Sequence, residues 1–288
     1  MCPDRQSASS NAAGRPRGAP TLPTVSRWSA GAANPRAVYG RLLAELPVQR
    51  KVRSCLVGLG WTVVESEACG IAMTFREGLH TSTLRPPLAG RSLTEVAGHM
   101  LGWNLYDAAI GLAALNSYFN APARVQSWLR PSLEEAAAES IFEVLAERIA
   151  GQKVAVVGHF PDLELLAADC RLTILERRPQ RGDLPDPACE YVLPEQDVVF
   201  ITGTAFTNRT LPRLLELARD AFLVLVGPSV PLTPLWFEFG VDLLAGTVVT
   251  NPAGVRRAAE EGAHREIFAA GAQMVQMTPG DVRLGFRP

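Results

Sequence analysis

Side chains that could bind or react with a ligand recur where short apolar runs end in the second half of the chain. Each of four such runs is followed by small, hydroxyl-bearing or ionisable residues. Small residues at such points let backbone N–H groups approach an anion or a polar ligand. The four clusters hold Gly158, His159 and Phe160, then Glu176, then Thr202, Gly203, Thr204 and Asn208, and finally Gly227 and Ser229.

His159 is the histidine whose position favours chemistry, because it lies beside a glycine at the end of a predicted strand. An imidazole there could hydrogen-bond a ligand, transfer a proton or bind a metal ion, and it could equally close the loop. The other histidines, His80, His99 and His264, have no partner at the spacing of metal ligands. The sequence therefore predicts no three-ligand zinc site.

Glu238 lies in an apolar stretch, Trp236-Phe237-Glu238-Phe239, which prolines precede. A carboxylate in such surroundings needs a partner or a ligand, because burying it alone is costly. Glu238 is therefore, like His159, a candidate catalytic or metal-binding residue. The alternative is that it forms a structural ion pair.

The sequence evidence for a nucleotide-binding site is weak. The dinucleotide fingerprint needs three glycines, and the first loop offers only Gly158. Glu176 follows Gly158 by 18 residues, near the offset of a carboxylate that binds a ribose. Its alternative is a solvated charge beside two arginines.

Three further polar residues are candidates. Asn208 is placed to cap a helix, which leaves the preceding threonines unexplained. In the first half of the chain, Glu65 ends a predicted strand, and Asn116 is a polar residue within an apolar helix. Asn116 must find a hydrogen-bond partner, either in a neighbouring loop or in a cleft between domains.

Parallel strands would bring the four clusters to one edge of a sheet. The apolar runs alternate with helical segments, which predicts a mostly parallel sheet covered on both sides, with right-handed crossovers. Strands are expected over 154–157, 172–176, 198–202, 222–226, 241–244, 247–249 and 273–277, and helical segments over 162–169, 208–220, 235–239 and 252–261. In such open sheets, ligands bind where the strands end.

The segment before this sheet predicts strands first and helices after, which is an α+β domain. A helix ends at Pro47, and a three-stranded meander covers 52–59, 61–65 and 70–75. A buried helix covers 104–119, and capping boxes at 92–95 and 132–135 open two others, the second running to about residue 149. We therefore expect a flexible tail over 1–35, an α+β domain over 36–150 and an α/β domain over 151–288.

Composition excludes several classes of protein. The net charge of −1 argues against nucleic acid or an anionic membrane surface as the partner. The five cysteines form no CxxC pair and are odd in number, which favours reduced thiols in the cytoplasm. The longest uncharged runs, 108–123 and 221–237, are shorter than the roughly 18–20 residues of a membrane-spanning helix. The chain could also assemble as a homo-oligomer.

Four motifs resemble those of the prokaryotic heavy-metal chelation family, a family of unknown function. They are GHFP at 158–161, ERRPQRGDLP at 176–185, ITGTAFTN at 201–208 and GPSVPL at 227–232, and the resemblance runs from about residue 36 onward. It implies an N-terminal domain similar to that of enolase, followed by a Rossmann-like domain, with a site between them.

Two functions are weighed from these observations. In the first, the interdomain cleft binds a small anionic metabolite, a divalent metal ion or a metal chelate, with His159 or Glu238 as ligand or acid–base group. Nitrogen and oxygen donors of this kind suit hard or borderline metals. In the second, the Rossmann-like half belongs to an enzyme that uses a nucleotide or S-adenosylmethionine, with Glu176 on the ribose. A non-catalytic binding or assembly protein is a third alternative.

Overall fold

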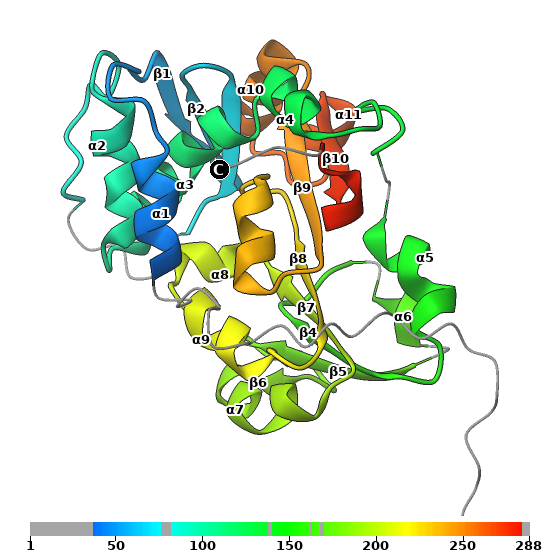
Figure 1. The fold of residues 1–288 in the computed structure, drawn as a ribbon. Coiled ribbons are helices and arrows are strands. Elements are labelled where there is room, and N and C mark those ends of the chain that lie inside the picture. The colour runs from blue at the N-terminus through cyan, green and yellow to red at the C-terminus, as the bar shows by residue number, and fades with distance from the viewer. Residues whose placement is uncertain (1–36, 76–81, 138–139, 162, 168–169, 284–288) are drawn as a thin grey trace, which may run out of the picture.

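The chain forms two sheets, one after the other along the sequence (Figure 1). The structure is a computed structural model, which describes residues 37–75, 82–137, 140–161, 163–167 and 170–283. The expected tail over 1–35 therefore lies outside the described residues. None of the described helices is long and apolar enough to cross a membrane.

The N-terminal part, residues 37–137, contains the expected three-stranded antiparallel meander. Helix α3 is apolar on most sides and is buried along nearly its whole length, and Asn104 caps its N-terminus by accepting from the N–H groups of Tyr106 and Asp107. The elements are α1 (Val38–Ala44), β1 (Ser54–Val57), β2 (Trp61–Glu65), β3 (Cys69–Met73), α2 (Leu93–Gly98), α3 (Leu105–Phe119) and α4 (Pro122–Trp128).

Helix α3 lies directly on strand β3 because Gly70 has no side chain. A Cβ atom at Gly70 would lie 2.0 Å from the backbone N of Ser117 and 2.3 Å from the carbonyl oxygen of Ala113. This contact fixes the distance between the helix and the small sheet.

The C-terminal part, residues 140–283, contains a seven-stranded sheet in the order β10-β9-β8-β7-β4-β5-β6. Apart from β10, which is antiparallel to β9, neighbouring strands are parallel. This is a Rossmann-like order, whose switch point lies between β4 and β7. The strands are β4 (Lys153–Val157), β5 (Arg171–Glu176), β6 (Leu184–Pro185), β7 (Val198–Thr202), β8 (Phe222–Val226), β9 (Leu243–Val249) and β10 (Ala272–Met277).

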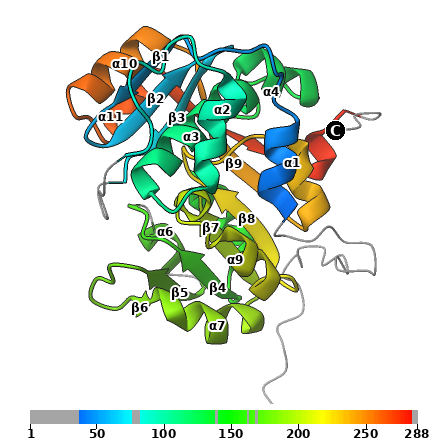
Figure 2. The same ribbon diagram turned by 90° about the vertical axis from the view of Figure 1, so that its left-hand side faces the viewer.

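Short helices connect these strands. They are α5 (Ile141–Ala146), α6 (Glu164–Ala167), α7 (Cys189–Val192), α8 (Thr204–Thr207), α9 (Leu211–Leu217), α10 (Pro252–Glu260) and α11 (Glu266–Ala269). Figure 2 shows α10 and α11 beside the three-stranded sheet, at the end of the molecule away from β5 and β6. The predicted fold class, α+β followed by a mostly parallel α/β sheet, is confirmed.

Several expected elements differ in detail. The helix predicted over 208–220 is shorter and forms α9, and a separate short helix, α8, precedes the predicted range. Arg209, whose φ of 63° is left-handed, lies between the two. The two strands predicted over 241–249 form one strand, β9. Ser132 and Glu135 bond reciprocally as a capping box should, but the chain makes turns there and pairs Ala137 with Val275, so α5 begins only at Ile141.

The capping box expected at 92–95 does not form. Ser92 makes no side-chain cap bond to helix α2, and Glu95 instead pairs with Arg91. The Glu95 carboxylate that would complete the capping box is therefore held in the ion pair with Arg91.

One hydrophobic core connects the two parts. It includes residues of α1, α2 and α3 together with residues of β7, β8 and β9. The apolar face of the N-terminal part is thus buried against the larger sheet.

Candidate functional site

The carboxyl ends of β4, β7 and β8 open into one cavity of about 740 Å³. Since β4 and β7 flank the switch point, this is where an open α/β sheet binds ligands. The strand ends contribute His159, Phe160 and Pro161, then Thr202, Gly203 and Thr204, and then Val226, Gly227, Pro228 and Ser229.

Other segments enclose this main cavity. The N-terminal part supplies Trp61 and Met73, so both parts of the chain line it. The remaining walls come from the segment before and within α5, from α11 and the loops that flank it, and from β10. They comprise Ala137, Ser140, Ile141, Phe142, Thr250, His264, Arg265, Phe268, Gly271, Ala272, Gln273 and Met274.

The first strand end requires a glycine. Gly158 has a φ of +105°, which other residues rarely adopt, and a Cβ atom there would lie 2.9 Å from the Cβ of Thr202. Gly158 thus lets the loop that carries His159 turn tightly against the end of β7.

The N-terminal part holds the third strand end in place. The backbone N–H of Met73 donates to Ser229 Oγ at 3.0 Å, and Asn116 Nδ2 donates to the carbonyl oxygens of Ser229 (3.1 Å) and Ile71 (2.9 Å). Asn116 is fully buried and does not line the cavity. Of its two predicted roles, the structure shows the bond to a neighbouring loop, and that loop is part of the cavity wall.

Asn120, one helical turn after Asn116, extends this attachment and was not predicted. Its Nδ2 donates to the carbonyl oxygens of Val230 (2.9 Å) and Thr247 (3.0 Å), and its Oδ1 accepts from the N–H of Leu232 (2.7 Å). The spacing of two amides four residues apart at the end of an apolar helix is the signal that could have found it.

His159 has a carboxylate partner, Asp183, that was not predicted either. His159 Nδ1 lies 3.1 Å from Asp183 Oδ2, and the Asp183 side chain is 3 % exposed. The two residues are 24 positions apart. Only the fold of the loop after β5 brings them together, so no local spacing could have revealed the pair.

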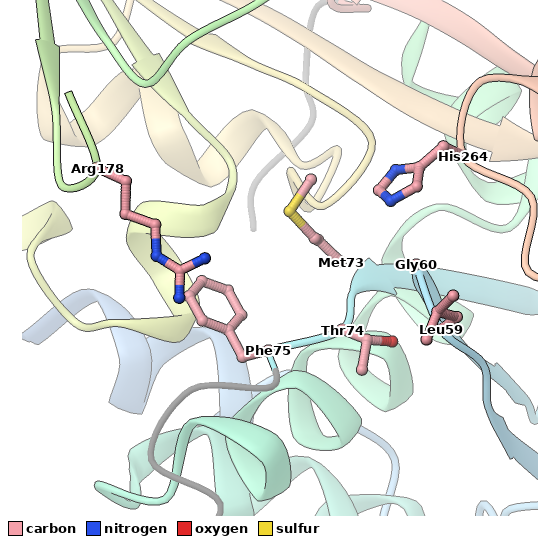
Figure 3. Close-up of a pocket in the computed structure, with 7 residues that line it drawn as sticks. All are labelled: Leu59, Gly60, Met73, Thr74, Phe75, Arg178 and His264. Atoms are coloured by element: carbon pink, nitrogen blue, oxygen red, sulfur yellow. The ribbon is translucent and has the colours of Figure 1, made fainter. Parts of the chain in front are cut away.

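A second cavity of about 410 Å³ adjoins the main one (Figure 3). The two share Met73 and His264, and we call them together the cleft. Figure 3 shows the guanidinium of Arg178 beside the ring of Phe75, with the His264 imidazole on the opposite side and Met73 between them. Leu59, Gly60 and Thr74 complete this second cavity.

The charged residues that line the cleft are basic. They are Arg178 and Arg265, accompanied by the ionisable rings of His159 and His264. Among the described residues, no aspartate or glutamate lines either cavity. The described lining of the cleft thus carries basic groups of the kind that favour an anion.

Six predicted site residues do not line the cleft: Gly158 and Asn116, described above, and four others, Glu238, Glu176, Asn208 and Glu65. Glu238 instead accepts two bonds from Arg41, at 2.6 and 3.3 Å, in a half-exposed ion pair. This is the structural alternative weighed for Glu238. Of the other three, Glu176 accepts from the N–H of Arg178 in its own loop, Asn208 from the N–H and hydroxyl of Thr210, and Glu65 pairs in the small sheet with Ser54 and Cys69.

The histidines, cysteines and carboxylates that the structure describes do not form a site for a bare heavy-metal ion. Within the described ranges, no three His, Cys, Asp or Glu residues come together as a metal site. Burial raises the pKa of three thiols, that of Cys55 to about 11, Cys69 to about 12 and Cys189 to about 11. Such thiols stay protonated at neutral pH, and the thiolate is the form that binds metals.

Comparison with known proteins agrees with this architecture. Two family models, both described as "Putative heavy-metal chelation", match the chain: DUF4213 over residues 39–119 and DUF364 over residues 140–278. An uncharacterized protein of Methanocaldococcus jannaschii is 32% identical over 208 residues, which cover 66% of this chain and 75% of that protein.

Two crystal structures of DUF364-family proteins of unknown function share the fold. The protein from Desulfitobacterium hafniense is 35% identical, with a TM-score of 0.75 over 85% of this chain and 98% of that one. The protein from Pyrococcus horikoshii is 24% identical, with a TM-score of 0.69 over 85% of this chain and all of that one. The resemblance seen in the sequence motifs is confirmed, and the chain belongs to the DUF364 family, whose printed description is "Putative heavy-metal chelation".

Proposed function

We propose that the protein binds a small organic anion, either free or as the chelator of a metal ion, in the cleft. The observation that carries this proposal is the convergence of three strand ends, with His159, Thr202 and Ser229, on one cavity that Met73 of the N-terminal part also lines. The volume of about 740 Å³ lies within the range of small-molecule sites, about 300–1,000 Å³.

The charge of the cleft supports an anion. Arg178 and Arg265 lie on its walls, and two carboxylates described nearby are bonded to the protein outside the lining, Asp183 to His159 and Glu266 to the N–H of His264. Small residues at the strand ends add backbone donors, which favour negative charge.

The apolar walls support an organic body for this anion. Phe142, Phe160 and Phe268 line the main cavity together with Trp61 and Met73. Aromatic and thioether side chains gain from contact with flat or apolar groups, and an inorganic anion would leave them facing water.

A metal ion in this cleft would arrive with its own chelator. The part of the lining that the structure describes offers two imidazoles and the thioethers of Met73 and Met274, but no cysteine or carboxylate, so it supplies no negatively charged ligand for a bare divalent ion. A chelate needs less from the protein, because the organic ligand fills most of the coordination sphere and presents charge to the arginines. This is how the geometry accommodates the chelation role in the family's description.

The cytoplasm is the compartment that we propose for this binding protein, since Cys55, Cys69 and Cys189 are thiols and not disulfides. The nucleotide or S-adenosylmethionine alternative has no specific support, because Glu176, its ribose ligand, does not line the cleft.

Native mass spectrometry of the purified protein, followed by metal and organic analysis of the denatured material, tests the proposal. We expect an organic anion to copurify, with metal present only in proportion to it. Thr204→Tyr, which adds a bulky ring to the lining of the main cavity, should lose this ligand, and Glu238→Gln, outside the cleft, should keep it.

A thermal-shift screen of organic acids, each alone and with a bound transition metal, supplies the ligand if none copurifies. The proposal fails if no such compound stabilises the protein. It also fails if a bare metal ion binds one per chain in both the wild type and Thr204→Tyr.

A further inference from the structure

Asp183 is held rigidly where it meets His159. Its backbone N–H donates to the carbonyl oxygen of Gln180 at 3.1 Å, and the N–H of Gln180 donates to Asp183 Oδ2 at 2.9 Å. Gly182, with a φ of +104°, makes the tight turn between them possible. The carboxylate is therefore fixed by the loop itself and does not depend on a ligand.

This carboxylate sets the tautomer of the neutral imidazole. An ionised carboxylate only accepts hydrogen bonds, so at 3.1 Å from Asp183 Oδ2 the Nδ1 of a neutral His159 must carry the proton. Its Nε2 is then the nitrogen with a lone pair. The His159 side chain is 32 % exposed and lines the main cavity, so the lone pair is accessible to a ligand.

Thr202, at the end of the neighbouring strand, supplies a hydrogen-bond donor to complement this acceptor. Its Oγ1 accepts from the N–H of Thr204 at 3.3 Å and from the Thr204 hydroxyl at 3.1 Å. Both acceptor positions of Thr202 are thus taken, which leaves its own O–H to donate. One acceptor and one donor on adjacent strand ends match a hydroxyl group, which both donates and accepts.

We propose that Asp183 is a positioning residue that holds His159 Nε2 as a hydrogen-bond acceptor, and that the ligand is a hydroxylated organic acid. Its hydroxyl binds at the strand ends between His159 and Thr202, and its acidic group lies toward Arg178 and His264. A ligand with acceptors at both ends would place an oxygen lone pair against the Nε2 lone pair. The ligand part of this proposal rests on the proposed function, whereas the role of Asp183 does not.

The role of Asp183 is tested on the protein without added ligand. Long-range ¹H–¹⁵N correlation NMR at about pH 8.5, well above the ordinary pKa of an imidazole, reports which ring nitrogen is protonated. His159→Gln assigns the signal. We expect the Nδ1–H form in the wild type and in Asp183→Asn, whose side-chain oxygen still accepts from Gln180 and His159.

Asp183→Ala removes the acceptor, and the ring should then shift toward the Nε2–H form. Asp220→Asn, at an exposed surface carboxylate, is the matched control and should change nothing. A wild-type ring in the Nε2–H form overturns the proposal, as does an unchanged tautomer in Asp183→Ala.

The ligand class is tested with paired probes, namely 4-hydroxyphenyl acids with zero, one or two methylenes before the carboxylate and their 4-fluoro counterparts. We expect the best hydroxyl probe to bind the wild type about tenfold more tightly than its fluoro counterpart, the effect of one good hydrogen bond. Asp183→Ala should reduce this preference to less than about threefold without weakening the fluoro probe.

Equal binding of the two series, or no binding by either, contradicts the hydroxylated class. Neither result affects the conclusion that the tautomer measurement gives for Asp183. Copurification of a non-hydroxylated acid would reject this class and leave the proposed function standing.

Discussion

Replacing Asn120 tests how firmly the N-terminal part is attached to the wall of the cleft. Asn120 is 1 % exposed and bonds three backbone groups of the C-terminal part, namely the carbonyl oxygens of Val230 and Thr247 and the N–H of Leu232. In Asn120→Ala these three backbone groups stay buried but lose the side-chain amide as their hydrogen-bond partner.

The expected cost follows from these three bonds. A buried polar group that loses its partner costs about 1–3 kcal/mol, and a carbonyl that keeps other partners costs least. Taking about 2 kcal/mol for the N–H and about 1 for each carbonyl gives about 4 kcal/mol, which a water molecule in the vacated space would reduce to about 3. A loss of this size is large for a single substitution.

Urea unfolding followed by both far-UV circular dichroism and tryptophan fluorescence measures this loss. We expect one coincident transition in the wild type, because one core spans both parts. The control is Asn208→Ala, whose side chain accepts from the N–H and hydroxyl of Thr210 in its own turn, and it should lose less than about 1 kcal/mol. A loss below about 1 kcal/mol in Asn120→Ala, or two separate wild-type transitions, would refute the reasoning.

Three further predictions concern a strand end, a buried thiol and a surface ion pair. Gly158→Ala should destabilise by about 2 kcal/mol in the same assay, because of its positive φ and the 2.9 Å approach to Thr202; an unchanged midpoint would contradict this. Burial raises the pKa of Cys69 from 9.0 to about 12, so its share of the stability is complete below pH 9 and falls as pH rises toward 12. Unfolding titrations should show a smaller alkaline loss in Cys69→Ala, and equal losses would reject the assignment. Glu238→Gln, which breaks a half-exposed pair with Arg41, should cost less than about 1 kcal/mol, and a larger loss would show that the pair is structurally important.

The strand ends of the site could be predicted because fully buried parallel strands leave a plain pattern. Runs of four or five apolar residues end in Gly158, Thr202 and Gly227, and topology alone brings such ends to one edge. The meander that precedes these strands could also be predicted from the sequence, because glycines separate its strands.

The cationic side of the cleft could not be predicted in the same way. Arg178 and His264 lie in loops, and His264 reaches the cleft only because the loop between α10 and α11 packs on the small sheet, where its carbonyl accepts from Trp61 Nε1 at 2.8 Å. Such contacts join residues some 200 positions apart and leave no local spacing.

Glu238 shows the opposite error of inference. Its apolar neighbours in the sequence suggested burial, but Trp236 and Phe239 are buried while Glu238 turns outward to Arg41. Neighbours along a tight 3-10 turn point in different directions, so their hydrophobicity says little about the residue between them.

The placement of β10 has a consequence for the order in which the protein is made. Gln273 and Met274 line the main cavity, and His264 lines both cavities, although the strand ends that they face are synthesised some forty to a hundred residues earlier. A nascent chain that has not reached Met274 therefore lacks a wall of the cleft, however well its earlier segments have folded. The proposed ligand binding would therefore require that translation has passed this point, and a transcript cut short before it yields a chain without the complete cleft.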